Sequence, residues 1–217
     1  RLAAGFLRAA LARGADLRAP VEVTAVEAGA DGVAAQAAAG PVVRGRHLVF
    51  ATGYELPRHV PRKGYRIVST FCLATGPQPR AVPHDLPFVW EASNPYLYLR
   101  VDHEGRIICG GEDEDFVDED RRDALLADKV EALQNKLAKL LPEADVEARY
   151  AWCGSFGAST TGTPSIGSVP RLAGCYAVLG YGGNGITFSM MAAQMLRGLI
   201  AGSGDPDSDL FSFRRTF

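Results

Sequence analysis

Several short segments of the chain alternate hydrophobic and polar residues, which is the spacing of half-buried β-strands. In the first quarter of the sequence this pattern predicts three strands, over 17–28, 33–38 and 42–51. Turns rich in glycine, proline and aspartate separate them. A helix is predicted ahead of these strands, because apolar residues recur there at helical spacing. These residues are Leu2, Phe6, Leu7, Ala10 and Leu11.

The middle of the chain predicts a second set of strands, over 66–75, 86–91, 96–101 and 106–110. The acidic run 112–115 that follows is expected to be a solvated loop leading into a helix. This helix is predicted over 118–141, because leucines and valines form one apolar stripe along it and Pro142 ends it. Beyond it we expect a strand over 146–152, and then an irregular segment rich in glycine, serine and threonine up to Ser168.

The stretch from Cys175 to Leu199 predicts an apolar strand, a glycine-rich turn and an amphipathic helix. Glycine has no Cβ and tolerates positive φ, so such a turn lets another group approach the backbone closely. The first turn of the helix adds unpaired N–H groups and a partial positive charge. An anion or the electron-rich edge of a ligand could bind there, and the alternative is a tight connection that binds nothing. The turn has no Walker lysine, so we expect no phosphate cradle.

Composition excludes several classes of protein. The 217 residues carry a formal net charge of −2, so no global field favours binding to nucleic acid or to an anionic membrane. The sequence has no apolar run of the roughly 20 residues that a membrane span needs. Its four cysteines are scattered and predict reduced, mostly buried thiols in a cytoplasmic protein. Its four histidines show no spacing typical of metal ligands, so no metal site is predicted.

The beginning of the sequence affects how the rest is interpreted. All three methionines lie in the last predicted helix, and the chain opens at Arg1 inside what looks like a helix. No pattern of a processed signal peptide explains such a start. We therefore expect the chain to be the C-terminal part of a longer protein.

Four segments stand in a recognisable order. They are HLVFATGYELP (47–57), YLYLRVDHEGRIICGGE (96–112), WCGSFGASTTGTPSIG (152–167) and LGYGGNGITFSMMAA (179–193). As an ordered set they resemble the flavin-dependent amine oxidase superfamily of glycine oxidase, sarcosine oxidase and D-amino-acid oxidase. The resemblance covers nearly the whole chain but lacks that family's N-terminal GxGxxG strand, which holds the ADP half of FAD.

The resemblance implies an α/β (α+β) fold, in which part of a Rossmann-like FAD-binding domain is interleaved with an antiparallel-sheet substrate domain. It implies that 1–62 and 151–217 belong to the FAD-binding domain and that 63–150 form the substrate domain. The segment absent from the N-terminus would complete the pyrophosphate site. We therefore expect these 217 residues alone to bind FAD weakly or not at all, and to be inactive.

The resemblance also implies which residues contact FAD. Val23 corresponds to a backbone contact with the adenine, and the alternative is plain strand packing. The turn beside the cofactor corresponds to Ala51, Thr52 and Gly53. The loop and first helical turn near the flavin C2 carbonyl correspond to Gly180, Gly182, Gly183, Asn184, Gly185, Ile186 and Thr187. Helix N–H groups there would stabilise the negative charge of a reduced flavin.

Three residues are candidates for the substrate site. Tyr98 matches a family tyrosine that faces the substrate, although a half-buried strand tyrosine is an equal alternative. Phe156 stands four residues after Trp152, where amino-acid oxidases of the family usually carry an arginine that binds the substrate carboxylate. An apolar ring cannot bind a carboxylate, so Phe156 argues against a simple α-amino acid unless Arg100 substitutes. It favours an amine distant from a carboxylate, such as a polyamine derivative, and core packing is the alternative.

The function that the resemblance implies is FAD-dependent oxidation of the C–N bond of a small amine or amino-acid-like substrate, by hydride transfer to the flavin. Two alternatives stay open. One is a non-catalytic module that binds a small molecule or a partner protein. The other is an NAD(P)-linked reductase domain that uses Ala51-Thr52-Gly53, which the lack of a second dinucleotide fingerprint weakens.

Overall fold

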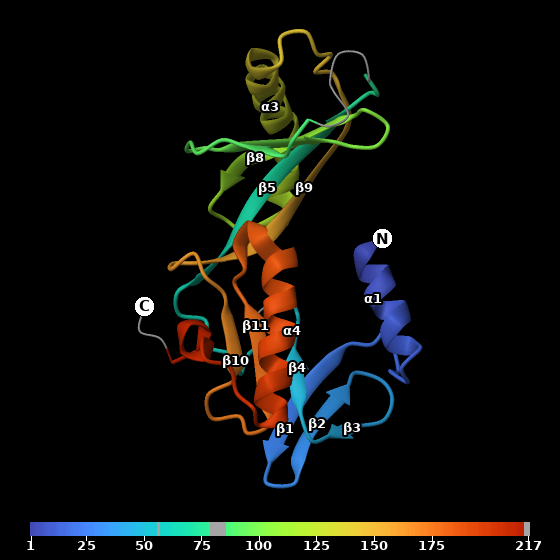
Figure 1. Ribbon diagram of the computed structural model, residues 1–217, viewed down its shortest axis with the longest axis vertical. Coiled ribbons are helices and arrows are strands. Elements are labelled where there is room, and N and C mark those ends of the chain that lie inside the picture. The colour runs from blue at the N-terminus through green and yellow to red at the C-terminus, as the bar shows by residue number, and fades with distance from the viewer. Residues whose placement is uncertain (56, 79–85, 215–217) are drawn as a thin grey trace.

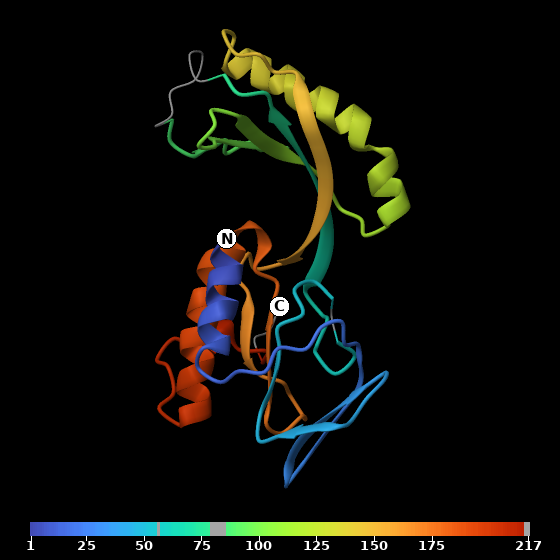
Figure 2. The same cartoon turned by 90° about the vertical axis from the view of Figure 1, so that its right-hand side faces the viewer.

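The structure is a computed structural model that describes residues 1–55, 57–78 and 86–214. A five-stranded antiparallel sheet forms one half of the molecule, in the order β6-β7-β8-β5-β9. Its strands are β5 (Tyr65–Thr75), β6 (Val89–Trp90), β7 (Leu97–Val101), β8 (Ile107–Glu114) and β9 (Ala148–Ser159). β5 and β9 bend together, with helix α3 (Leu126–Leu140) on the outer side of the bend and the other half of the molecule on the inner side (Figure 2).

The outer face of this sheet holds the largest core. Residues at alternate positions of the strands point toward α3 and are fully buried, including Phe71, Leu73, Leu99 and Ile107, and Leu133 of α3 is buried among them. Since side chains alternate along a strand, the intervening residues of β5 and β9 point toward the inner side of the bend. The sheet therefore has one face committed to the core and one face left for other uses.

Two smaller sheets make up the other half (Figure 1). One is antiparallel, of β1 (Val23–Gly29), β2 (Gly32–Ala37) and β3 (Val43–Gly45). The second has the order β10-β11-β4 and consists of β4 (Leu48–Phe50), β10 (Ser165–Ser168) and β11 (Cys175–Leu179). Helix α4 (Gly185–Ala201) packs on it through a buried cluster that includes Ile166, Val178 and Met195. The other described helices are α1 (Leu2–Leu11), α2 (Glu119–Ala124) and the short 3-10 helices η1 (Gly182–Asn184), directly before α4, and η2 (Ser208–Phe211).

This mixture of helices, an antiparallel sheet and a parallel β4–β11 pair confirms the predicted α/β (α+β) class. Two predicted elements are divided in the structure. The strand expected over 42–51 is two strands in different sheets, β3 and β4. The helix expected over 118–141 is α2 and α3, which meet at Leu125, whose N–H is shared between the carbonyls of Arg121 and Arg122. The division into 1–62, 63–150 and 151–217 stays a prediction.

The prediction of a solvated loop over 112–115 is wrong, because β8 continues to Glu114. Glu112 is buried, and its carboxylate lies 2.6 Å from the Lys136 ammonium of α3. Glu112 also has a positive φ of 56°, at a β-bulge in the pairing of β5 with β8. The bulge breaks the alternation, and the lysines of α3 neutralise the acidic residues, so neither effect could be read from the local sequence.

The irregular segment expected after Trp152 is also wrong. The 12-residue strand β9 continues to Ser159 in antiparallel register with β5, so that Phe156 lies opposite Val68. Small residues give a weak strand signal by themselves, and the pairing with the long strand β5 decides the conformation instead. This correction places Phe156 on a strand of the sheet, and no longer in a loop.

Candidate functional site

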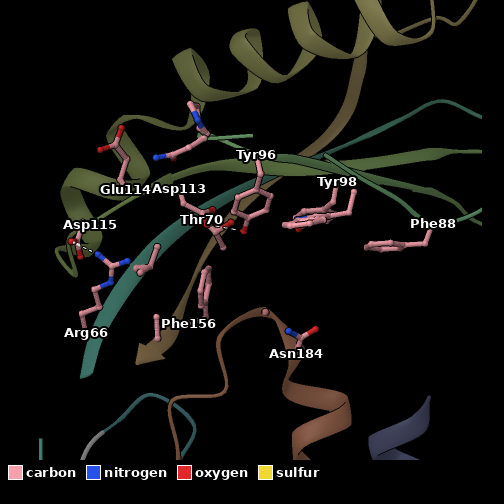
Figure 3. A pocket seen from close by; sticks show the side chains of 16 residues that line it. Arg66, Thr70, Phe88, Tyr96, Tyr98, Asp113, Glu114, Asp115, Phe156 and Asn184 are labelled. Atoms are coloured by element: carbon pink, nitrogen blue, oxygen red, sulfur yellow. Dashed lines mark hydrogen bonds and ion pairs between the residues drawn. The ribbon is translucent and has the colours of Figure 1, made fainter. Parts of the chain in front are cut away.

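A cavity of about 1120 Å³ lies between the inner face of the large sheet and the turn that leads into α4 (Figure 3). Strands β5 to β9 of the sheet and the residues next to them supply one side, and Gly183 and Asn184 supply the other. Four of the predicted site residues thus line one cavity, namely Tyr98, Phe156, Gly183 and Asn184. The other residues that the argument below uses are Arg66, Phe88, Trp90, Tyr96, Asp113, Glu114 and Asp115.

Four aromatic rings follow one another along a wall of the cavity. The rings of Phe88 and Tyr98 are stacked, with centroids 6.1 Å apart, and those of Tyr98 and Tyr96 are stacked at 6.3 Å. Trp90 continues the row, 6.3 Å from Tyr96. Phe88 and Trp90 are each about 60% exposed, at 63% and 60%. Large aromatic side chains left this exposed beside a cavity are typical of a ligand-binding wall.

The ring of Tyr98 occupies space that a glycine on the neighbouring strand leaves open. Its hydroxyl lies 3.0 Å from the Cys72 thiol, and it crosses Gly110 on the neighbouring strand. A Cβ on Gly110 would stand 2.3 Å from the Tyr98 oxygen and 2.6 Å from the Cys72 sulfur, so only glycine fits there. Burial first, and then the contact with Cys72, raises the pKa of Tyr98 well above its usual range. The phenol therefore keeps its proton at neutral pH and can donate a hydrogen bond.

The arginine that lines the cavity is not the one that the sequence predicted. Arg100 is exposed on β7, and the structure does not place it among the described residues that line the cavity. The guanidinium that does line it belongs to Arg66, which is paired with Asp115 at 2.7 Å. Both partners of this ion pair are more than half exposed, so it contributes about 0–1 kcal/mol.

Asp113 is the residue that sequence reasoning missed most clearly. Its Oδ2 accepts a hydrogen bond of 2.7 Å from the Tyr96 hydroxyl, while its Oδ1 is buried with no hydrogen-bond partner in the described part of the chain. Burial and the bond to Asp113 raise the pKa of Tyr96, so this phenol also stays protonated. Tyr96 carried a usable signal, because it stands two residues before Tyr98 and shares its face of the strand. Asp113 did not, since it was assigned to a loop.

The predicted cofactor turns meet at one edge of the smaller mixed sheet. β4 and β11 are parallel and hydrogen-bonded neighbours, so the turns that follow them, 51–53 and 180–184, leave the sheet at the same edge. In the first turn, the Thr52 hydroxyl donates to the Glu55 carbonyl at 2.5 Å. Carboxyl ends of parallel strands are where α/β sheets bind ligands. The topology thus brings the two turns to one edge of the sheet, and their contact with a cofactor stays a prediction.

The turn into α4 needs glycine at its start. Gly180 has a φ of +72°, and a Cβ there would lie 2.6 Å from the Tyr65 ring. The next glycines have open space around them, since a Cβ on Gly182 or Gly183 would meet nothing within 4 Å. Helix α4 then begins at Gly185 without a side-chain cap from Asn184, and Ile186 in its first turn is 78% exposed. Ile186 and Thr187 thus belong to the first turn of α4, which follows the 3-10 helix 182–184 and carries the partial positive charge of the helix N-terminus.

Val23 is the predicted cofactor residue that lies apart. It begins β1 in the separate three-stranded sheet, pairs with Ala37 and is 54% exposed. Its contact with an adenine stays a prediction. Elsewhere, across the residues that the structure describes, no helix is long and apolar enough to cross a membrane. No group of three or more metal-ligating side chains occurs in the same described ranges.

The family described as FAD dependent oxidoreductase matches residues 1–199, and the chain belongs to this family. The predicted resemblance is thereby confirmed, and FAD is the cofactor to which family membership points. A comparison with curated proteins found no match.

Solved structures show the same fold. Glycine oxidase from Geobacillus kaustophilus superposes with a TM-score of 0.80 at 22% identity, over 100% of this chain and 58% of that chain. L-proline dehydrogenase from P. horikoshii superposes with a TM-score of 0.80 at 18% identity, over 98% of this chain and 58% of that chain. Iminodiacetate oxidase from Chelativorans sp. BNC1 superposes with a TM-score of 0.75 at 22% identity, over 97% of this chain and 57% of that chain. This chain therefore spans somewhat more than half the length of these proteins.

Proposed function

We propose that the intact protein oxidises the C–N bond of a small amine or amino-acid-like substrate, by hydride transfer to FAD. The observation that carries this proposal is the aromatic cavity that opens onto the uncapped N-terminus of α4. When bound, FAD supplies the acceptor for the hydride, which no side chain can provide. The chain's own residues then have to bind the amine, orient its C–H bond and exclude water.

The turn into α4 is suited to the negative charge that reduction creates. Gly182 and Gly183 leave space for a flat ring to approach the backbone, and the first N–H groups of α4 lie behind them. Hydrogen-bond donors fixed in place before the reaction stabilise developing charge without reorganisation. Ala51, Thr52 and Gly53 would border the same ring from the neighbouring strand end, which agrees with the shared edge of β4 and β11.

The opposite side of the cavity is suited to an amine. The neutral phenol of Tyr98 can donate a hydrogen bond to a polar group of the substrate, and the surrounding rings exclude water from the reacting carbon. Phe156 contributes an apolar surface where a carboxylate-binding arginine would be needed for a simple α-amino acid. The site thus favours an amine whose carboxylate is absent or distant.

The structural neighbours support this chemistry by analogy, since their names include glycine oxidase, L-proline dehydrogenase and iminodiacetate oxidase. Because this chain spans only 58% of the first two, we propose that a preceding segment of the same protein completes the FAD site. These 217 residues alone should then bind FAD weakly and be inactive. Four free cysteines agree with a reducing, cytoplasmic location.

An absorbance scan of the intact protein tests the proposal. The protein should show the bands of oxidised flavin, and anaerobic addition of a suitable amine should bleach them. A protein that stays colourless after FAD is added would contradict the proposal and favour a non-catalytic binding module. Bleaching by NAD(P)H with no response to any amine would favour the reductase alternative.

A further inference from the structure

We propose that the cavity selects a substrate with a second cationic group, an ammonium or guanidinium, distant from the amine that is oxidised. Asp113 is the anchor for this second cation; Tyr96 is hydrogen-bonded to it, and the ring of Trp90 lies next to that of Tyr96. The proposal deepens the proposed function and rests on it for the reaction, but the binding site itself can be tested separately. Its basis is the combination of a carboxylate oxygen without a partner and a row of exposed aromatic rings.

The carboxylate of Asp113 is only half satisfied. The Tyr96 hydroxyl donates to Oδ2, and Oδ1 is buried with no donor in the described ranges. A buried anionic oxygen is costly to leave without a hydrogen bond, and few native structures keep one without a reason. A ligand N–H that carries a positive charge would supply the missing donor and neutralise the carboxylate in one contact.

The neighbouring carboxylates already have cationic partners. Asp115 is paired with Arg66 at 2.7 Å, and Glu114 with Lys129 at 2.6 Å. Asp113 has no ion pair among the described residues, so its charge is the one that remains available to a ligand. Of the three carboxylates that border the cavity, Glu114 and Asp115 are therefore neutralised by their partners, and the charge of Asp113 attracts a cation and repels a second carboxylate.

The aromatic wall suits the same ligand. Tyr96 places its hydroxyl on Asp113 and its ring in the row that continues to Trp90, at 6.3 Å. Cations bind the faces of such rings, most strongly that of tryptophan, and lose little by leaving water when a carboxylate is also present. An uncharged N–H could still donate to the carboxylate, but it would lack the cation–π attraction and the charge assistance that strengthens the hydrogen bond.

The position of Asp113 also sets the shape of the ligand. Figure 3 shows Asp113 and Tyr96 on the sheet side of the cavity, with Asn184 on the opposite side, at the turn into α4. A ligand with one end on Asp113 and its reacting carbon near that turn must be elongated, with two nitrogen groups separated by a chain. A diamine of four carbons is a suitable first probe.

The test uses calorimetric titration of the intact, FAD-loaded protein with three compounds. 1,4-Diaminobutane carries both charges, N-acetyl-1,4-diaminobutane keeps the length but only one charge, and n-butylamine lacks the second nitrogen. The wild type should bind the diamine about 10- to 100-fold more tightly than either monocation. Asp113→Asn should abolish this preference, since the amide still accepts the Tyr96 hydrogen bond but has no charge. Glu114→Gln, which removes a neighbouring charge already paired with Lys129, should retain it.

The comparison of compounds on the wild type alone keeps the proposal open to refutation if Asp113→Asn does not fold. Equal affinity for the three compounds, or no binding of the diamine, would overturn the proposal. Retention of the preference by Asp113→Asn would also overturn it. Flavin that is bleached by amines without this preference would leave the proposed function standing and the cation site refuted. A preference that depends on Asp113, in a protein whose flavin no amine bleaches, would leave the cation site standing alone.

Discussion

The two faces of the five-stranded sheet carry the same strands but very different chemistry. On the outer face, Phe71 and Leu73 of β5 are fully buried against α3. On the inner face, Arg66 and Thr70 of the same strand border the cavity. Alternation along one strand thus separates the residues that hold the fold together from those that can bind a ligand. Substitutions on the two faces should differ accordingly, in stability on one and in ligand binding on the other.

The largest effect on stability is expected from Leu133→Ala on the outer face. Leu133 is completely buried under the sheet, and its removal leaves a cavity that α3 cannot close. The free energy of unfolding should fall by about 2–5 kcal/mol, measured by chemical denaturation. The matched control is Leu140→Ala on the same helix, where the side chain is 50% exposed, and the loss should be much smaller. Equal losses would contradict the assignment of the outer face to the core.

On the inner face, Gly110→Ala should displace Tyr98. The new Cβ would stand 2.3 Å from the Tyr98 oxygen, so the ring must move away. The free energy of unfolding should fall by about 1–3 kcal/mol. Gly154→Ala is the control in the same sheet, because nothing lies within 4 Å of the added Cβ. Combining Gly110→Ala with Tyr98→Ala should recover part of the loss. If the double variant is as unstable as the sum of the single ones, Tyr98 is not what Gly110 accommodates.

Phe156→Arg tests the specificity of the same face. A guanidinium at this position would offer a fork for a substrate carboxylate, and it would add a cation to the acidic cavity. In the intact enzyme, kcat/KM for small α-amino acids relative to polyamine-like amines should rise by about 10-fold or more. An unchanged ratio would show that Phe156 does not decide between these substrates.

The smallest effect is expected at alkaline pH. The fold raises the pKa of Tyr98 above its unfolded value of about 10, so above pH 10 the unfolded chain loses a proton that the folded chain keeps. The stability that this adds is complete below pH 10 and declines as pH rises further. The slope should be less than about 1.4 kcal/mol per pH unit, because the ring is only half-buried. Tyr98→Phe should reduce this decline in urea titrations, whereas replacement of the exposed Tyr150 by Phe should not.

The sequence was most informative where a local pattern is also the structural rule. The glycine turn before α4 and the strand Cys175–Leu179 could be predicted because backbone conformation requires glycine there and burial requires the apolar run. Tyr98 and Phe156 were found through the family resemblance, and the structure places both at the cavity.

What could not be predicted depends on distant partners. Asp113 lies on β8 because the lysines of α3 neutralise its neighbours and a bulge interrupts the alternation. Phe156 lies on a strand because β9 pairs with β5 along the whole length of β5. Arg66 replaces Arg100 as the cation at the cavity, a difference that only the relative position of β5 and β7 decides. These relations join residues far apart in sequence, and no local pattern carries them.

The central claim, that this cavity is the amine site of a flavin enzyme, is tested most directly by anaerobic titration of the intact, FAD-loaded protein with 1,4-diaminobutane while the flavin absorbance is followed. We predict that the oxidised bands bleach, and that the diamine does so at lower concentration than n-butylamine. Bands that persist through a panel of amines, in a protein that still binds FAD, would contradict the claim.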